Sequence, residues 1–371
     1  MDEHHRGLSA THALADFEPL ARLTMEPAAF DYVAGGSWEE LSLARNLAAW
    51  RERRLRPRVL VDVSRIDPAT TMLGQPTTMP LAIAPMAAHG LAHAAAEEAT
   101  ARAAAAAGVP FILSTMSTCS MEDVARAAPD GVRWFQLYVQ AEPVRTRELV
   151  QRAEAAGYGA IVLTVDLPVL GYRERDRRSG FDLPGPHGNF ATAGVDATHG
   201  GGIHAAGFDL LEDGALTGLS WDDLATIRGW SSLPLVLKGI MTAEDAQLAA
   251  EHGVEAIVVS NHGARQLDRV QAPVDVLEAV VAAVDGRTEV WVDGGVRRGH
   301  DIAIARALGA RGVLLGRPVL WALAANGQAG VERALEIVRT EFEIALALLG
   351  TPTPDDIGPA HIVPETAGSG R

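Results

Sequence analysis

The sequence is poor in cysteine and in positive charge, and each shortage excludes a class of protein. Cys119 is the one cysteine among 371 residues, so an internal disulfide is excluded and we interpret this residue as a small buried apolar one. The net charge of −15 argues against binding to nucleic acid or to anionic membranes, because both require a positive surface. Hydrophobic residues make up 48% and charged residues 21% of the chain, which is typical of a globular protein rather than a disordered one.

Long apolar runs and metal-ligand clusters are also missing. No apolar run is long enough to span a membrane, and residues 1–11 lack the apolar core of a signal peptide, so the cytoplasm is the expected location. His4, His5 and His12 lie near the N-terminus, but no pattern of cysteines or carboxylates completes a metal site around them. We therefore predict no metal centre.

From Pro80 onward the chain alternates short apolar runs with amphipathic stretches, a pattern typical of βα units with parallel strands. The apolar runs are Leu81–Ala84, Phe111–Ser114, Trp134–Val139, Ala160–Val165, Leu235–Lys238, Ala256–Ser260, Val290–Asp293 and Gly312–Gly316. Helices are expected at Ala94–Ala107, Pro143–Ala156, Thr242–His252 and Arg298–Leu308. Eight βα units over about 260 residues predict a TIM (β/α)8 barrel. A doubly wound sheet is the alternative, but no GxGxxG motif follows the first run.

The barrel, expected at residues 80–349, has additions at both ends and one long insertion. Residues 1–79 are expected to form a helical extension packed on the barrel, in which Ser37 and Glu40 predict a capping box. Residues 350–371 would be a tail. A glycine-rich insertion at residues 174–219, after the fourth strand, is far longer than an ordinary βα loop and is interpreted as a lid over the catalytic face.

The segment Ser260–Asp268 is the strongest candidate for a catalytic loop. It follows the apolar run at 256–259, and it offers an imidazole at His262 and a guanidinium at Arg265. That pair is suited to taking a proton from a molecule whose carboxylate is held by arginine. A histidine at a strand end is often structural, so the remaining strand ends decide between the two interpretations.

Polar residues close nearly every predicted strand, and on a TIM barrel such residues form the active site. They are Ser114, Gln136 and Tyr138, Thr164 and Asp166, Lys238, Ser260 and His262, Asp293, and Gly316 with Arg317. Glycines and arginines after the last two strands, in the runs 293–297 and 316–317, indicate a phosphate site. The buried Lys238 is compatible either with Schiff-base chemistry or with stabilising an anionic ring.

Nine consecutive residues, Ser260–Asp268, closely resemble the signature of the FMN-dependent 2-hydroxy-acid oxidase and dehydrogenase family, and the resemblance extends from about Phe30 to Leu349. It implies FMN as the cofactor and favours the second role for Lys238, near flavin N1 and O2. It implies that Ser114, Gln136 and Thr164 bind the flavin ring and that Pro85, Met86 and Ala87 lie beside N5. The other cofactor residues expected are Ser260, Asp293, Gly294, Gly295, Arg297, Gly316 and Arg317.

The same resemblance implies roles in substrate binding. His262 would be the base, Asp166 would stabilise the imidazolium, and Arg173 and Arg265 would bind the carboxylate. Tyr32 and Tyr138 match the two family tyrosines that contact substrate.

Met116 departs from the family pattern, because glycolate oxidases carry Trp and lactate oxidases Tyr at this position. Residues 87–93 resemble lactate oxidases, whereas residues 171–176 resemble mandelate dehydrogenases.

We therefore expect FMN-dependent oxidation of an (S)-2-hydroxy acid to a 2-oxo acid, with O2 as acceptor and H2O2 as product. The substrate would be a medium or aromatic, mandelate-like acid, or lactate. A dehydrogenase with another electron acceptor is the alternative, and a Schiff-base aldolase on Lys238 or a non-catalytic flavin-binding barrel is more distant. The family resemblance also implies a homo-oligomer, either a tetramer or an octamer.

Overall fold

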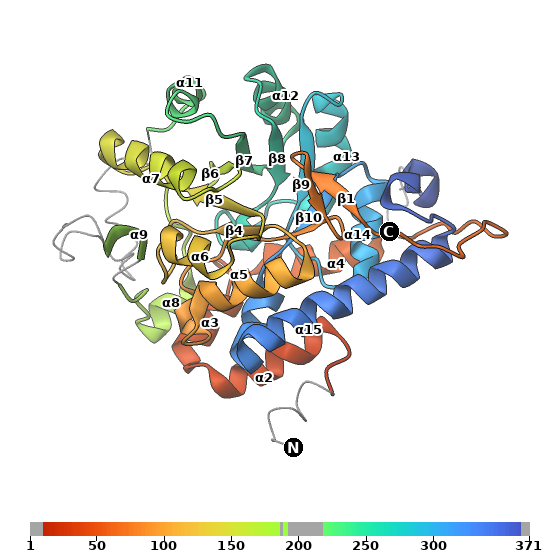
Figure 1. The fold of residues 1–371 in the computed structure, drawn as a ribbon, viewed down its shortest axis with the longest axis horizontal. Helices are drawn as coiled ribbons and strands as arrows, with labels where there is room; N and C mark the ends of the chain where they lie inside the picture. Colours follow the sequence, from red (N-terminus) through yellow and green to blue (C-terminus); the bar gives the residue numbers. More distant parts are fainter. Residues whose placement is uncertain (1–9, 186–187, 192–217, 365–371) are drawn as a thin grey trace.

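A closed barrel of eight parallel strands forms the centre of the molecule (Figure 1), as the sequence predicts. The computed structural model describes residues 10–185, 188–191 and 218–364. The barrel strands are β3 (Leu81–Ile83), β4 (Phe111–Leu113), β5 (Arg133–Leu137), β6 (Ile161–Thr164), β7 (Leu235–Ile240), β8 (Ala256–Val259), β9 (Glu289–Val292) and β10 (Gly312–Leu315). Each predicted apolar run coincides with one strand, and the ends differ by a residue or two, because strand ends are set by backbone pairing rather than by hydrophobicity.

Helices surround the barrel and bury their apolar stripes against it. They are α5 (Ala96–Ala107), α6 (Met121–Ala127), α7 (Pro143–Ala155), α11 (Asp223–Arg228), α12 (Ala243–Glu251), α13 (Pro273–Val284), α14 (Gly299–Ala307) and α15 (Arg317–Leu349). α15 is interrupted at Asn326 and Gly327, whose backbone is not helical. It packs against α5, α14 and the N-terminal α2 (Phe17–Thr24), and Figure 1 shows it crossing beneath the barrel.

The N-terminal residues form α2, α3 (Pro27–Ala34) and α4 (Leu41–Glu52), and also a hairpin of β1 (Thr70–Met72) and β2 (Gln75–Thr77) that the helical prediction for residues 1–79 did not include. The predicted capping box is wrong. Ser37 Oγ donates to the carbonyls of Ala264 and Gln266, and Glu40 Oε1 accepts from the Gly36 N–H at 2.9 Å. Ser37 therefore joins the extension to the loop after β8, because carbonyls from that loop compete successfully with the local capping bond.

The hairpin closes the N-terminal end of the barrel. Met72 packs with Trp134 and Trp291, whose rings stack with centroids 4.9 Å apart, and the Leu73 N–H donates to Glu289 at 3.2 Å. This end is filled by apolar side chains, so ligands are left with the C-terminal ends of the strands.

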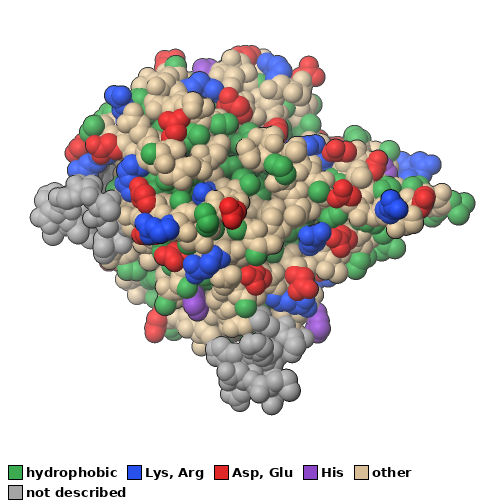
Figure 2. Space-filling model, in the orientation of Figure 1, with side chains coloured by type: hydrophobic (Ala, Val, Ile, Leu, Met, Phe, Trp, Pro, Cys, Tyr) green, Lys and Arg blue, Asp and Glu red, His purple; other side chains and the backbone are tan. Residues whose placement is uncertain are grey.

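The connection between β6 and β7 contains α8 (Glu174–Ser179), α9 (Gly188–Ala191) and α11. Most of the predicted lid, residues 192–217, lies outside the described residues. In the part of the chain that is described, no helix combines the length and apolarity needed to cross a bilayer. On the face drawn in Figure 2, acidic and basic side chains are interspersed.

Candidate active site

The loop after β8 carries His262 in a strained conformation. His262, Gly263 and Ala264 have φ angles of 58°, 62° and 61°, and two of these residues are not glycines, so the surrounding structure must hold them there. His262 Nδ1 lies 2.8 Å from Asp166 Oδ1, which follows β6. Gly239 makes room for this carboxylate, since a Cβ at residue 239 would lie 2.6 Å from the Asp166 Cβ. The fold thus brings together the imidazole and carboxylate singled out in the sequence.

The pKa values of this pair move in directions that suit a general base. Burial lowers the pKa of His262, and the charges of Lys238 and Arg173 add to the effect, whereas Asp166 opposes it. Burial alone would raise the pKa of Asp166, but His262 and Lys238 outweigh burial and hold that pKa below its usual range. The pair at neutral pH is therefore a neutral imidazole beside an ionised carboxylate. Among the described residues, His262 Nε2 has no hydrogen-bond partner, so this nitrogen can accept a proton.

Lys238, near the end of β7, is held as a buried cation. Its Nζ lies 3.1 Å from Asp293 Oδ2 and donates to Ser260 Oγ at 3.0 Å. Burial acts to lower the pKa of Lys238, yet the Asp293 and Asp166 charges outweigh it and raise the pKa. A Schiff-base nucleophile needs a neutral amine, so this environment suits the stabilisation of negative charge instead. Asp293 Oδ1 is buried and has no hydrogen-bond partner within the described residues.

Two arginines lie at the same end of the barrel, and their guanidinium groups differ in the hydrogen bonds that they already form. Arg173 is buried, and burial together with the Arg265 charge lowers its pKa to about 10. Its Nε donates to the Arg265 carbonyl at 3.5 Å, and neither Nη atom of Arg173 has a hydrogen-bond partner in the described part of the chain. Arg265 Nη1 instead donates to the carbonyls of Tyr32 and Gly35 at 2.5 and 3.1 Å. Arg173 is therefore the freer of the two predicted carboxylate ligands.

The two predicted substrate tyrosines belong to this cluster. The Arg265 guanidinium lies 4.7 Å from the centre of the Tyr32 ring. Tyr138 is close enough to Asp166 for that charge, after burial, to raise its pKa, and the charges of Arg173 and Arg265 act on it in the opposite sense. The Tyr138 phenol therefore stays protonated at neutral pH and can donate a hydrogen bond.

A continuous row of polar side chains closes β4, β5 and β6. Gln136 Oε1 accepts from Ser114 Oγ at 3.2 Å, and Gln136 Nε2 donates to Thr164 Oγ1 at 3.1 Å. The Met116 N–H donates to Ser114 Oγ at 3.1 Å, and the Met116 carbonyl accepts from the Ala88 N–H at 3.0 Å. These bonds connect the row to residues 85–88 and to the buried Met116. The row offers the mixture of donors and acceptors that the edge of a planar heterocycle requires.

The glycine-rich loop after β9 is shaped by contact with α4. Gly294 and Gly295 have φ angles of 79° and 101°, and a Cβ at residue 295 would lie 2.2 Å from the Asn46 carbonyl oxygen. Trp50 Nε1 donates to the Gly294 carbonyl at 2.9 Å. These glycines are required by packing against α4 as well as by backbone conformation, which the sequence analysis had not foreseen.

Arg297, in this loop, and Arg317, at the start of α15, are half-buried cations. Neither forms an ion pair within the described residues. Burial lowers the pKa of Arg297 to about 10 and that of Arg317 to about 9. Arg317 donates to the carbonyls of Val33, Gly35 and Gly263, and it follows Gly316 at the N-terminus of α15. Two half-buried guanidinium groups that no described carboxylate pairs with fit the binding of an anionic phosphate group.

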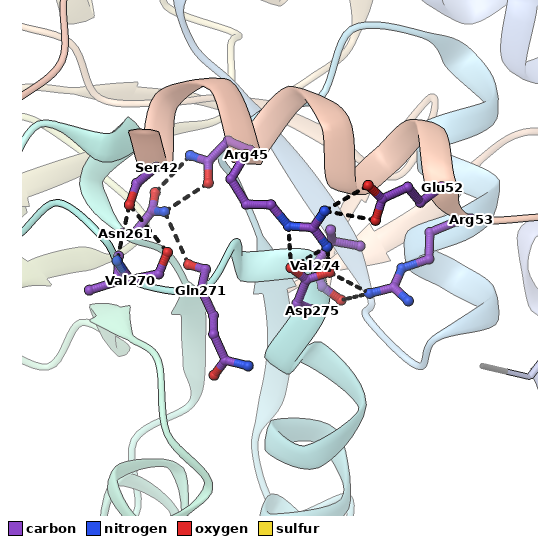
Figure 3. A network of polar contacts seen from close by, with 10 residues as sticks. Ser42, Arg45, Glu52, Arg53, Asn261, Val270, Gln271, Val274 and Asp275 are labelled. Atoms are coloured by element: carbon purple, nitrogen blue, oxygen red, sulfur yellow. Dashed lines mark hydrogen bonds and ion pairs between the residues drawn. The ribbon is translucent and has the colours of Figure 1, made fainter. Parts of the chain in front are cut away.

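Several residues that the sequence analysis missed support the site. Figure 3 shows α4 lying over the loop after β8 and the start of α13, with Ser42 bonded to Val270 and both Arg45 and Arg53 bonded to Asp275. Asn46 and Asn261 exchange two amide hydrogen bonds. No local pattern could have identified this pair, because its members lie 215 residues apart.

Comparison with known proteins assigns the family. Residues 21–364 match the sequence model of the family described as FMN-dependent dehydrogenase. The chain belongs to the FMN-dependent dehydrogenase family. An L-lactate oxidase of Nostoc is 49% identical over 94% of this chain and 97% of its own length. The glycolate oxidase of Spinacia oleracea is 45% identical over 95% and 96%. A crystal structure of mandelate oxidase with (S)-4-hydroxymandelic acid has a TM-score of 0.86 at 42% identity, covering 93% of this chain and 97% of that one.

As a member of this family, the protein is an FMN-dependent 2-hydroxy-acid oxidase, which confirms the resemblance found in the sequence. The arginines Arg297 and Arg317, the polar row on β4 to β6 and the charged Lys238 fit FMN. The names of the relatives differ in substrate, so they leave the hydroxy acid open.

Proposed function

We propose that the protein oxidises (S)-2-hydroxy acids to 2-oxo acids, with His262 as the base and Arg173 as the principal carboxylate ligand. The observation that carries the proposal is the 2.8 Å contact between His262 and Asp166, close enough to Arg173 for its charge to act on His262. His262 Nε2 takes a proton from the hydroxy acid, and Asp166 stabilises the imidazolium that results. Tyr138 donates to the substrate, and the side of Arg265 that is not bonded to carbonyls completes the carboxylate site with Tyr32 beside it.

We propose that FMN lies along the polar row and the glycine-rich loop. When bound, it supplies the acceptor for the two electrons and the hydrogen that leave the substrate. Ser114, Gln136 and Thr164 would hold the edge of the ring. Lys238, kept in position by Ser260 and Asp293, would supply positive charge beside the ring. The remaining predicted contacts are Pro85, Met86 and Ala87 beside the ring, and Gly294, Gly295, Arg297, Gly316 and Arg317 at the phosphate.

We propose a substrate larger than glycolate, either mandelate-like, medium aliphatic, or lactate. Met116 is buried and unbranched, so it can adopt several rotamers and leave room that an indole would fill. Similarity to a mandelate oxidase and to a lactate oxidase supports this range without choosing within it. O2 is the proposed acceptor because the relatives are named oxidases, and a dehydrogenase with another acceptor is the alternative.

Assembly and location stay predictions. The arm of residues 53–69 (orange in Figure 1) exposes Val59 and Leu60 at 82% and 103%. Exposed aliphatic residues of this kind support association of copies, such as the predicted tetramer or octamer. The cytoplasm is the expected compartment, although one relative from Arabidopsis thaliana carries a peroxisomal name.

The test is an anaerobic titration of the FMN-loaded protein with (S)-lactate, glycolate, (S)-mandelate and a medium aliphatic hydroxy acid. We expect the flavin absorbance to bleach, and His262→Ala to retain FMN but to lose the reduction rate by roughly 10²- to 10⁴-fold or more. Subsequent admission of air should restore the absorbance and yield H2O2. If no acid bleaches the flavin, the proposal is refuted, and trapping of a carbonyl compound by borohydride would indicate the Lys238 aldolase instead.

A further inference from the structure

The geometry points to Asn46 of α4 as a positioning residue for His262. This inference rests on the proposed function, in which His262 is the base. Asn46 is buried, at 2% exposure, and lies in the N-terminal extension, outside the strand ends that form the catalytic face. Its role would be to hold the loop after β8 in the conformation that aims His262 at the substrate.

The contact between Asn46 and the catalytic loop is a closed pair of amide hydrogen bonds. Asn46 Nδ2 donates to Asn261 Oδ1 at 2.9 Å, and Asn261 Nδ2 donates to Asn46 Oδ1 at 2.8 Å. Asn261 directly precedes His262, and its Oδ1 also accepts from the Ala264 N–H at 3.1 Å. Asn261, which Asn46 holds in place, therefore bridges residues 262–264, the three residues with positive φ. Such a strained conformation persists only where the surrounding structure determines it.

The same residue of α4 also packs on the proposed phosphate loop, with its backbone at Gly295 and its amide near Gly294. A Cβ at residue 295 would lie 2.2 Å from the Asn46 carbonyl oxygen, so the carbonyl of Asn46 packs directly on Gly295. The Asn46 amide therefore bonds to the His262 loop and only packs beside Gly294, where an added Cβ would lie 3.2 Å from Asn46 Nδ2. A substitution that keeps the shape of the amide retains this packing and the main-chain contact with Gly295, so it should disturb the first loop more than the second.

Asn46→Asp is the most selective change. A carboxylate has nearly the same shape as the amide and can still accept from Asn261 Nδ2, but it cannot donate to Asn261 Oδ1. Rotating the Asn261 amide to compensate would cost its other bonds, because Asn261 Nδ2 donates to the Gln271 carbonyl and Asn261 Oδ1 accepts from the Ala264 N–H, which also donates to the Asn261 carbonyl. The loop should then relax. A displacement of about 1 Å at a reacting group can cost roughly 10²-fold in rate.

The experiment is anaerobic stopped-flow reduction of the FMN-loaded variants by a substrate that reduces the parent. We expect Asn46→Asp to lower the limiting reduction rate by about 10- to 100-fold, while FMN content and the dissociation constant of the substrate stay unchanged. Arg45→Gln is the matched control on the preceding residue, because it removes ion pairs to Asp275 and Glu52 without touching Asn261. It should lower the melting temperature at most.

Asn46→Ser provides a second variant if the aspartate prevents folding, since a hydroxyl is too short to complete both bonds. The double variant of Asn46→Ser with Asn261→Ala should be no slower than the slower single variant, because each change breaks the same pair. A parental limiting rate in both Asn46 variants would overturn the inference, as would an equal loss in Arg45→Gln. If His262→Ala itself reduced flavin at the parental rate, the proposed function would fail instead.

Discussion

Replacing Asp166 by Asn tests how much of the chemistry depends on the charge beside His262. In the proposed mechanism His262 becomes positively charged at a buried position where the charges of Lys238 and Arg173 already act on it. Two unit charges about 4 Å apart interact by about 4 kcal/mol at an effective dielectric constant near 20. The amide keeps the shape of the carboxylate but removes this interaction, so the flavin reduction rate should fall by roughly 10³-fold.

The pH profile of the same variant gives a second test, because a simple loss of activity would leave the pKa of His262 unchanged. The base must be neutral, so kcat/KM of the parent falls as the pH drops through the pKa of His262. Burial places that pKa below its ordinary value, against the opposing effect of Asp166. Asp166→Asn removes the opposing effect, so the pKa falls further. The acid limb should therefore shift to lower pH while the rate is reduced at every pH.

The assay is anaerobic stopped-flow reduction across pH, with Asp268→Asn as a control for the loss of a buried carboxylate. Asp268 accepts hydrogen bonds from the N–H groups of Leu41 and Ser42, so its replacement should affect stability and leave the acid limb in place. A reduction rate of Asp166→Asn within about tenfold of the parent, or an acid limb shifted to higher pH, would refute the electrostatic role of Asp166.

Three further predictions concern binding, specificity and reoxidation. Arg173→Lys should weaken substrate binding by about tenfold or more, because an ammonium cannot make the two-pronged contact of a guanidinium; an unchanged dissociation constant in spectral titrations would assign the clamp to Arg265. The parent should have a higher kcat/KM for (S)-mandelate or a medium aliphatic acid than for glycolate, and Met116→Trp should reverse this order. At about 0.8 kcal/mol per buried methylene the preference is graded, and a parent that prefers glycolate would contradict it. Ala87→Gly should slow reoxidation by O2 in stopped-flow mixing with air, and parental kinetics would show that Ala87 does not control access to the flavin.

The sequence predicted the barrel because buried parallel strands appear as short continuous apolar runs separated by helical periods. It also identified the residues at the strand ends, such as His262, Asp166 and Lys238, because polar side chains at those places are unexpected. The hairpin at residues 70–77 was missed, since strands of three residues are too short to show an alternating pattern.

What the sequence could not supply is the set of bonds between distant segments. Ser37 appeared to cap a helix because Glu40 follows it at the right spacing, yet its hydroxyl bonds to the loop after β8. Arg265 appeared equivalent to Arg173, but the carbonyls at the end of α3 occupy one of its nitrogens. In both cases the competing partner lies more than 200 residues away in the chain, so local spacing carried no information about it.

The loop that carries Met116 is held in place by bonds of the same kind. Glu97, in the first turn of α5, accepts the backbone N–H groups of His89 and of residues 118–119 at 2.9 to 3.0 Å. From the opposite side, Asn189 Nδ2 donates to the carbonyls of Ser114 and Thr115 at 3.2 and 3.0 Å. The backbone on both sides of Met116 is thus fixed by buried side chains from α5 and α9. Because the flexible Met116 side chain extends from a backbone held on both sides, we propose that the space available to a substrate depends on the Met116 rotamer, which is why Met116→Trp is the substitution chosen to test specificity.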